Sequence, residues 1–121
     1  MFIILKWRIP SKKNSKNIIT RWWKTFIISS KQYTSWENQQ MFEIRDIEPL
    51  WEWPFKIVCE FYMPDHRKTD LSNKFESVAD LLVKAKIIPD DNCCILSVVE
   101  LVYKWVDKDN PRCEVNIDFI I

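Results

Sequence analysis

The most informative absence in this chain of 121 residues is glycine, which does not occur at all. Because glycine adopts positive φ more easily than any other residue, the turns must be built from Asn, Asp, Ser and Pro. Without glycine there is also no Walker-type phosphate loop and no dinucleotide-binding fingerprint. We therefore expect no nucleotide cofactor.

Paired zinc ligands are also lacking. The sequence has one histidine, His66, and its four cysteines show no C-x-x-C spacing. A structural zinc site needs four such ligands, commonly spaced in pairs. Free buried thiols are the better interpretation of Cys59, Cys93, Cys94 and Cys113.

No hydrophobic run is long enough for a signal peptide or a membrane span. The apolar stretch at residues 1–10 is interrupted by Lys6 and Arg8. We therefore expect a cytoplasmic protein without membrane contact. With 47% apolar and 29% charged residues, the composition is that of a folded chain, and we expect residues 1–121 to form one domain.

Charge is unevenly distributed along the chain. Residues 1–45 hold nine Lys or Arg and two Asp or Glu, whereas residues 46–121 hold nine and fifteen. A basic half beside an acidic half suits a protein that binds phosphates with one region and a cation with another. The same charges can also simply solvate a surface.

Hydrophobic periodicity predicts five strands and two helices. The strands are expected at residues 2–8, 25–28, 55–62, 93–106 and 113–121, with a basic loop at 9–17. The helices are expected at residues 31–47 and 72–86. Segment 93–106 is long enough to be twisted or bulged, and the turn at 107–111 predicts a hairpin with the last strand.

These elements indicate an α+β fold of order β-β-α-β-α-β-β. The strand–helix–strand step across residues 72–86 favours a parallel neighbour formed by a right-handed crossover. We expect a mixed sheet with both helices on one face. Ser29 and Ser30 are suited to cap the first helix, and Ser72 with Glu76 is compatible with capping the second.

Acidic residues flank and line the second predicted helix. Asp70 precedes it, Glu76 and Asp80 lie on its polar face, and Asp90 and Asp91 follow in a turn. The loops that carry them can converge at one edge of a sheet, where sites tend to form. Phosphodiester hydrolysis commonly uses Mg²⁺ held by a few carboxylates and waters. Asp70 and Asp91 are our first choice of ligands.

Each of these residues also has an ordinary structural interpretation. Glu76 and Asp80 are common on a solvated helix face, and the Asp90 and Asp91 pair is common in turns. Lys74 is a candidate basic residue for the site, but it can equally lay its stem over the core. The lone His66 can assist at a phosphate, although loop histidines usually do not.

A resemblance to a known family favours the catalytic interpretation. Residues 63–73 (MPDHRKTDLSN), a helix containing Asp80, and residues 88–91 (IPDD) are similar to the signature of the RusA family of Holliday junction resolvases. That signature places a D-L-x-N step upstream of a paired Asp. Pro10, Ser11 and Asn14 resemble the P-P-S-x-N segment of the family, so the likeness spans most of the chain.

The resemblance implies a homodimeric Mg²⁺-dependent endonuclease, with Mn²⁺ as a possible substitute, that nicks opposing strands of four-way DNA junctions in recombination and repair. A twofold dimer presents one site to each cleaved strand. Asp70 and Asp91 correspond to metal ligands, and we add Glu76 and Asp90. Our catalytic set is Asp70, Asp91, Lys74 and Glu76, with Asp80 in support.

Two positions depart from the family pattern. Many members have a third acidic residue where this chain has Ser72, and a functional lysine where it has Glu76. Lys74, two residues earlier, and Glu76 can restore both charges in a different arrangement. The alternative is a catalytically impaired protein that binds branched DNA on the same fold.

The expected DNA-binding residues are mostly cations. They are Lys12, Lys13, Asn14, Lys16, Arg67, Lys68 and Asn73. Trp22 and Trp23, beside Arg21 and Lys24, can stack on unpaired bases at a junction or pack in the core or a dimer interface. A third interpretation is an interaction module whose acidic turn is only surface, which predicts no preference for branched over linear DNA.

Overall fold

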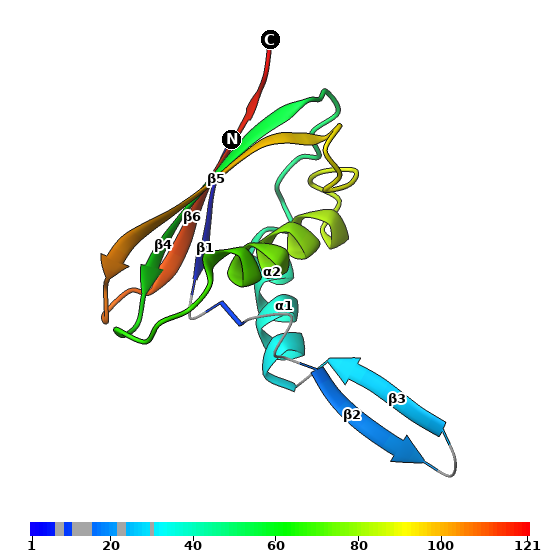
Figure 1. Ribbon diagram of the computed structural model, residues 1–121. Coiled ribbons are helices and arrows are strands. Elements are labelled where there is room, and N and C mark those ends of the chain that lie inside the picture. Colours follow the sequence, from blue (N-terminus) through cyan, green and yellow to red (C-terminus); the bar gives the residue numbers. More distant parts are fainter. Residues whose placement is uncertain (7–8, 11–15, 22–23, 30) are drawn as a thin grey trace.

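The computed structural model describes residues 1–6, 9–10, 16–21, 24–29 and 31–121, with backbone alone for 16–21 and 24–29. It contains a four-stranded mixed sheet, a separate two-stranded sheet and two helices. Both helices lie on the same face of the four-stranded sheet (Figure 1). The expected α+β fold with a mixed sheet is therefore confirmed.

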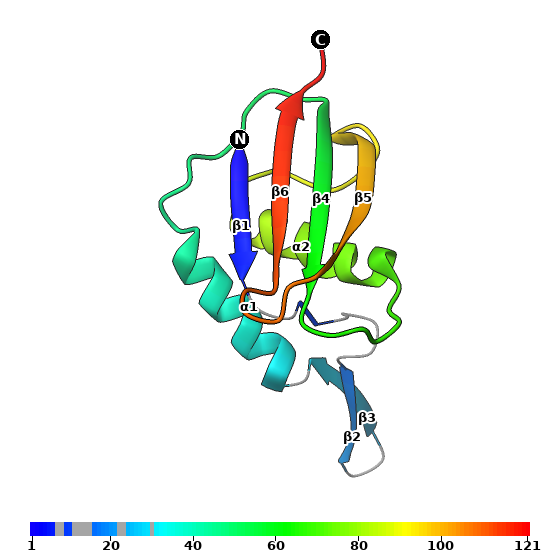
Figure 2. The ribbon, with the colours of Figure 1, turned by 90° about the vertical axis from the view of Figure 1, so that its left-hand side faces the viewer.

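The described residues form eight elements along the chain. They are β1 (Phe2–Lys6), β2 (Lys16–Arg21), β3 (Lys24–Ser29), α1 (Lys31–Glu43), β4 (Phe55–Met63), α2 (Leu71–Lys84), β5 (Leu96–Val106) and β6 (Arg112–Phe119). The main sheet has the order β1-β6-β4-β5, seen face-on in Figure 2. Among the described residues, no helix is long and apolar enough to cross a membrane.

Strand β4 lies at the centre of the sheet and of the core. Alternate residues are buried from Phe55 to Met63, as the period of two predicts. β4 pairs in parallel with β5, which confirms the neighbour expected from the strand–helix–strand step. Its other side pairs antiparallel with β6, and β6 pairs in turn with β1.

The predicted hairpin between the last two strands is wrong, because β4 lies between β5 and β6. Cys113, Val115 and Ile117 of β6 are almost fully buried, whereas most residues of β5 are partly or fully exposed. Pairing β6 with β4 places two strands with buried alternate residues side by side and leaves β5 at the edge. The energy gained by burying apolar surface therefore outweighs the short connection that favours a hairpin.

Strand β5 is bulged near its end, as its length predicted. The register passes from Phe61 opposite Tyr103 to Tyr62 opposite Trp105, which leaves Lys104 as the extra residue. Trp105 has a φ of 117°, a value rare outside glycine.

β5 begins at Leu96 rather than at residue 93, because Asn92 organises a turn there. Its side-chain oxygen accepts the backbone N–H groups of Cys94 and Ile95, at 2.9 and 3.2 Å. This turn exposes Cys93 and Cys94, so burial was wrongly predicted for them. All four cysteines are free, and Cys59 and Cys113 are buried as expected.

Helix α1 packs against the sheet and against α2. Tyr33 and Trp36 of the helix are buried, and so is Ile44 just after it. Lys84 Nζ of α2 lies 2.6 Å from Glu37 Oε1, and this ion pair joins the two helices. The helix ends at Glu43, a few residues earlier than expected.

Helix α2 begins with Leu71, and Asp70 rather than Ser72 occupies the N-cap position. Leu71 packs against the core, so the helix starts one residue earlier than expected and Ser72 lies exposed in the first turn. Ser30, one of the expected capping residues of α1, lies outside the described residues.

The β2–β3 hairpin is a separate sheet that extends away from the main sheet beyond α1 (Figure 2). β3 confirms the strand expected at 25–28, whereas β2 was not predicted. The backbone register places Arg21 opposite Lys24, at the end of the hairpin that is far from α1.

Candidate active site at the start of helix α2

The loop from Pro64 to Asp70 joins the end of β4 to α2. Asp65 folds it, because its Oδ1 accepts the Arg67 N–H at 3.0 Å and its Oδ2 lies 3.5 Å from Arg67 Nε. Residues 66–70 are exposed. The loop thus presents the predicted site residues Arg67, Lys68 and Asp70 to solvent.

Asp70 has an unusual role for an N-cap residue. Its backbone is extended, with φ −84° and ψ 121°, but its side chain makes no capping hydrogen bond. Its Oδ2 instead lies 3.5 Å from Asn73 Nδ2. An exposed carboxylate at a helix N-terminus is stabilised by the helix dipole, and this one is not occupied by capping. It is therefore well suited to bind a hard cation.

Two side chains of α2 hold the segment that leads to the basic loop. Lys74 is buried and its Nζ donates to the Ile9 carbonyl oxygen at 2.5 Å. The Ser77 hydroxyl, also buried, donates to the Pro10 carbonyl oxygen at 2.5 Å. The bond to Pro10 satisfies the Ser77 hydroxyl, which allows this polar side chain to be buried.

Three other predicted site residues extend along α2 from Asp70. At 100° per residue, Asn73, Glu76 and Asp80 share one flank of the helix. Glu76 is exposed, whereas Asn73 and Asp80 are half-buried. This flank is where the polar face was predicted.

Asp90 and Asp91 lie in the turn that follows α2. Asp90 Oδ1 accepts the Asp91 N–H at 2.8 Å, and Asp90 Oδ2 accepts the Asn92 amide at 2.8 Å. The hydrogen bonds from Asp91 and Asn92 lower the pKa of Asp90 below its ordinary value. Asp90 therefore serves the turn, while Asp91 is an exposed carboxylate beside it.

The structure does not bring Asp70 and Asp91 together within one chain. They lie at opposite ends of α2, which has 14 residues and spans about 21 Å. α2 leaves the carboxyl end of β4 and the chain returns to the amino end of β5, and parallel strands place these ends at opposite edges. The expected convergence at one edge is therefore wrong for a single chain. Within the ranges described, no group of three or more His, Cys, Asp or Glu is placed to hold a metal ion.

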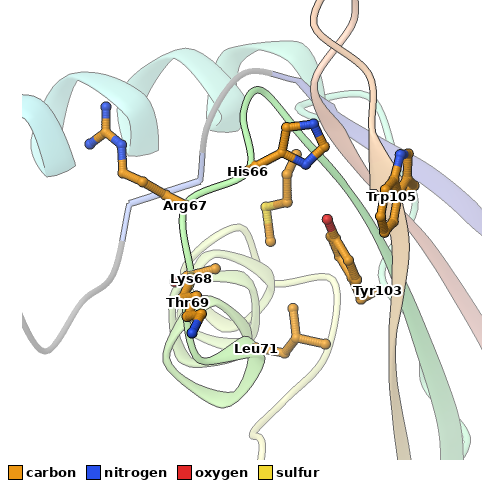
Figure 3. A pocket seen from close by; sticks show the side chains of 8 residues that line it. His66, Arg67, Lys68, Thr69, Leu71, Tyr103 and Trp105 are labelled. Atoms are coloured by element: carbon orange, nitrogen blue, oxygen red, sulfur yellow. The ribbon is translucent and has the colours of Figure 1, made fainter.

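An aromatic cleft that the sequence pattern did not predict lies beside Asp70. Its volume is about 410 Å³, and it is lined by Met63, His66, Arg67, Lys68, Thr69, Leu71, Tyr103 and Trp105 (Figure 3). The ring centroids of His66 and Trp105 are 5.6 Å apart in an edge-to-face arrangement. The available signal was the pair of aromatic residues near the end of the strand predicted to be bulged.

Several predicted DNA-binding residues fall outside the parts of the chain whose side chains the structure describes. Lys12, Lys13 and Asn14, together with Trp22 and Trp23, lie outside the described residues. Lys16, Arg21 and Lys24 belong to the hairpin whose backbone alone is described.

The α+β fold presents a carboxylate, cations and aromatic rings around the start of one helix. This combination fits an enzyme that acts on nucleic acid. The family profile described as Endodeoxyribonuclease RusA matches residues 8–118. This match covers most of the chain, so the chain belongs to the RusA endodeoxyribonuclease family, as its signature segments indicated. It is therefore a hydrolase that cuts DNA. A comparison with individual curated proteins gives no match.

Proposed function

We propose that the chain is a Mg²⁺-dependent endonuclease that resolves four-way DNA junctions by paired nicks during recombination and repair. The observation that carries the proposal is the exposed Asp70 carboxylate, which is not used in capping, at a helix start in a RusA family chain. Arg67 and Lys68 precede it in the same exposed loop, where they can bind the phosphates on either side of the scissile bond.

The donor atoms fit a hard cation. Mg²⁺ prefers oxygen ligands and is commonly held by one or two carboxylates, with water and substrate phosphates completing its shell. Asp70 supplies such oxygens, and Glu76 extends the same side of α2. When bound, Mg²⁺ polarises the phosphate and makes the attacking water more acidic. Mn²⁺, with similar ligand preferences, is the expected substitute.

The other residues of the site attract cations and hold the main chain in place. Negative charge at Asp70 and Glu76 concentrates cations at the start of α2. Lys74 and Ser77 fix Ile9 and Pro10 against the same helix, so the basic loop begins beside the site. Lys74 then acts as a positioning residue, because its ammonium is directed to the main chain.

Asp91 joins the same ion most simply from a second copy of the chain. Within one chain the length of α2 separates Asp91 from Asp70. Strand β5 is a sheet edge in the described chain, and it exposes Val98 and Val99, each 40% accessible. An open apolar edge of this kind suits pairing between two copies. We therefore propose a homodimer in which each Asp70 works with the partner copy's acidic turn.

Synthetic four-way junctions test the activity. We expect Asp70→Asn and Asp91→Asn each to abolish Mg²⁺-dependent nicking while junction binding in a gel shift persists. Asp109→Asn, an exposed turn aspartate, is the matched control and should cut normally. Nicking by both site variants would show that the site is misassigned. Wild-type protein that binds junctions but never nicks them with Mg²⁺ or Mn²⁺ would support the impaired binding protein, and equal binding to linear DNA would support an interaction module.

Mixed dimers test whether the site is shared. A heterodimer of the Asp70→Asn and Asp91→Asn variants retains one intact site if each site uses Asp70 of one copy and Asp91 of the other. We therefore expect the mixture of two inactive proteins to recover single-strand nicking. If each site lies within one chain, both sites of the heterodimer are damaged and the mixture stays inactive, which would overturn the shared site.

A further inference from the structure

The cleft beside Asp70 has the size and lining of a ligand site. Its volume of about 410 Å³ lies within the range typical of small-molecule pockets. Met63 and Leu71 supply apolar surface, and Tyr103 and Trp105, residues that are 45% and 62% exposed, supply aromatic rings. Large aromatic rings left this exposed beside a cleft mark a recognition surface.

The backbone holds Trp105 in this position at a cost. Its φ of 117° is unfavourable for a residue with a side chain, and the bulge at Lys104 interrupts the pairing with β4 just before it. Strained residues and bulges are found preferentially at functional sites, where they direct a side chain. Two neighbouring rings pack against the Trp105 ring and hold it in place. The ring centroids of His66 and Tyr103 lie 5.6 and 5.7 Å from the centroid of Trp105.

The charges around the cleft select a nucleotide over an apolar protein segment. The eight lining residues include Arg67 and Lys68 but no carboxylate. Figure 3 shows the Arg67 side chain extending outward from the loop, away from the aromatic rings. A ring that can stack on a base, beside cations that can hold the adjoining phosphates, is the combination found in sites for single-stranded nucleic acid.

We propose that this cleft binds one unpaired nucleobase of branched DNA, stacked on Trp105, so that the phosphate next to that base lies at Asp70. Lys68 is two residues from Asp70, so the phosphate contacts and the carboxylate follow one another along the loop. The proposal rests on the proposed function in one respect, that a DNA branch supplies the unpaired base. The cleft thus contributes to selection of branched over fully paired DNA.

A junction with 2-aminopurine at the branch point tests the proposal, because the emission of this base reports its stacking. The Asp70→Asn background is used so that cleavage does not interfere. We expect binding to quench the emission, and Trp105→Ala in this background to remove the quenching and weaken junction binding about 5- to 150-fold. Trp105→Phe keeps an aromatic ring and should therefore show part of the quenching and part of the junction affinity that Trp105→Ala loses. Trp51→Ala removes a tryptophan that is 79% exposed outside the cleft, and should change neither.

Three results would overturn the proposal. Unchanged quenching and affinity in Trp105→Ala would show that no base stacks there. Equal quenching on a fully paired duplex would remove the selection of unpaired bases. Conversion of Trp105→Ala from dimer to monomer in sedimentation would assign the ring to a protein contact. Failure of the nuclease proposal gives a different pattern, since a wild-type protein that never nicks can still show Trp105-dependent quenching. Circular dichroism should confirm that Trp105→Ala folds.

Discussion

Replacing Lys74 by Met tests whether this lysine positions the chain or takes part in chemistry. Met keeps an apolar stem in the same place but removes the ammonium that donates to the Ile9 carbonyl at 2.5 Å. A hydrogen bond to a charged group contributes about 1.5–3 kcal/mol. For 121 residues the entropy of unfolding is about 0.25 kcal/mol/K, so Tm should fall by about 6–12 °C.

Thermal unfolding followed by circular dichroism measures this shift, and Lys108→Met, at an exposed turn lysine, is the control that should leave Tm unchanged. Ser77→Ala removes the neighbouring bond to Pro10 and should cost about 1 kcal/mol, or about 4 °C. The stability losses of the two variants should not add up in the double variant, because both side chains hold the same segment. Nicking by Lys74→Met should persist below its Tm with weakened junction binding. Normal stability with complete loss of nicking would refute the positioning role.

Two further predictions concern ionisable groups away from the site. Burial and the nearby Glu37 raise the pKa of Tyr33 to about 12, so stability linked to Tyr33 is complete below pH 10 and is lost as the pH rises through 12. This loss of stability amounts to at most about 3 kcal/mol. The free energy of unfolding, measured with urea, should therefore fall less between pH 10 and pH 12 in Tyr33→Phe than in the wild type. An equal fall in both proteins would contradict the assignment. Cys93 and Cys94 are exposed and should react with a thiol reagent in the native state. Cys113 should react only on unfolding, because a hydrogen bond between its thiol and Cys59, together with burial, raises the pKa of Cys113. Two rapid thiol equivalents by absorbance would agree, and four would not.

Local patterns in the sequence predicted most elements and the parallel pairing of β4 with β5 across α2, but not the pairing of β6 with β4. The alternation in β4 and the helical stripe in α2 each depend on one face of one element, so they can be read from neighbouring residues. The pairing of β6 with β4 depends on which arrangement of the whole sheet buries most apolar surface. A short connection such as 107–111 favours a hairpin only when no better partner strand is available.

The same distinction applies to the site. Asp70 could be found from its sequence motif, because that motif is contiguous with the loop and the start of α2. The distance between Asp70 and Asp91 could not be predicted from the motif, because that distance depends on α2 running from one edge of the sheet to the other. The aromatic cleft depends on the bulge that turns Trp105 toward the 64–70 loop, and such a local irregularity leaves little trace in periodicity.

The attachment of the N-terminal segment to α2 has a consequence for how this protein can evolve. Lys74 and Ser77 bind carbonyl oxygens of Ile9 and Pro10, and every amino acid carries that group. Substitutions and insertions beyond Pro10 can therefore accumulate without detaching the segment from the helix that bears Asp70. If the loop binds DNA as proposed, its sequence can change with the DNA target while the acidic helix start stays unchanged.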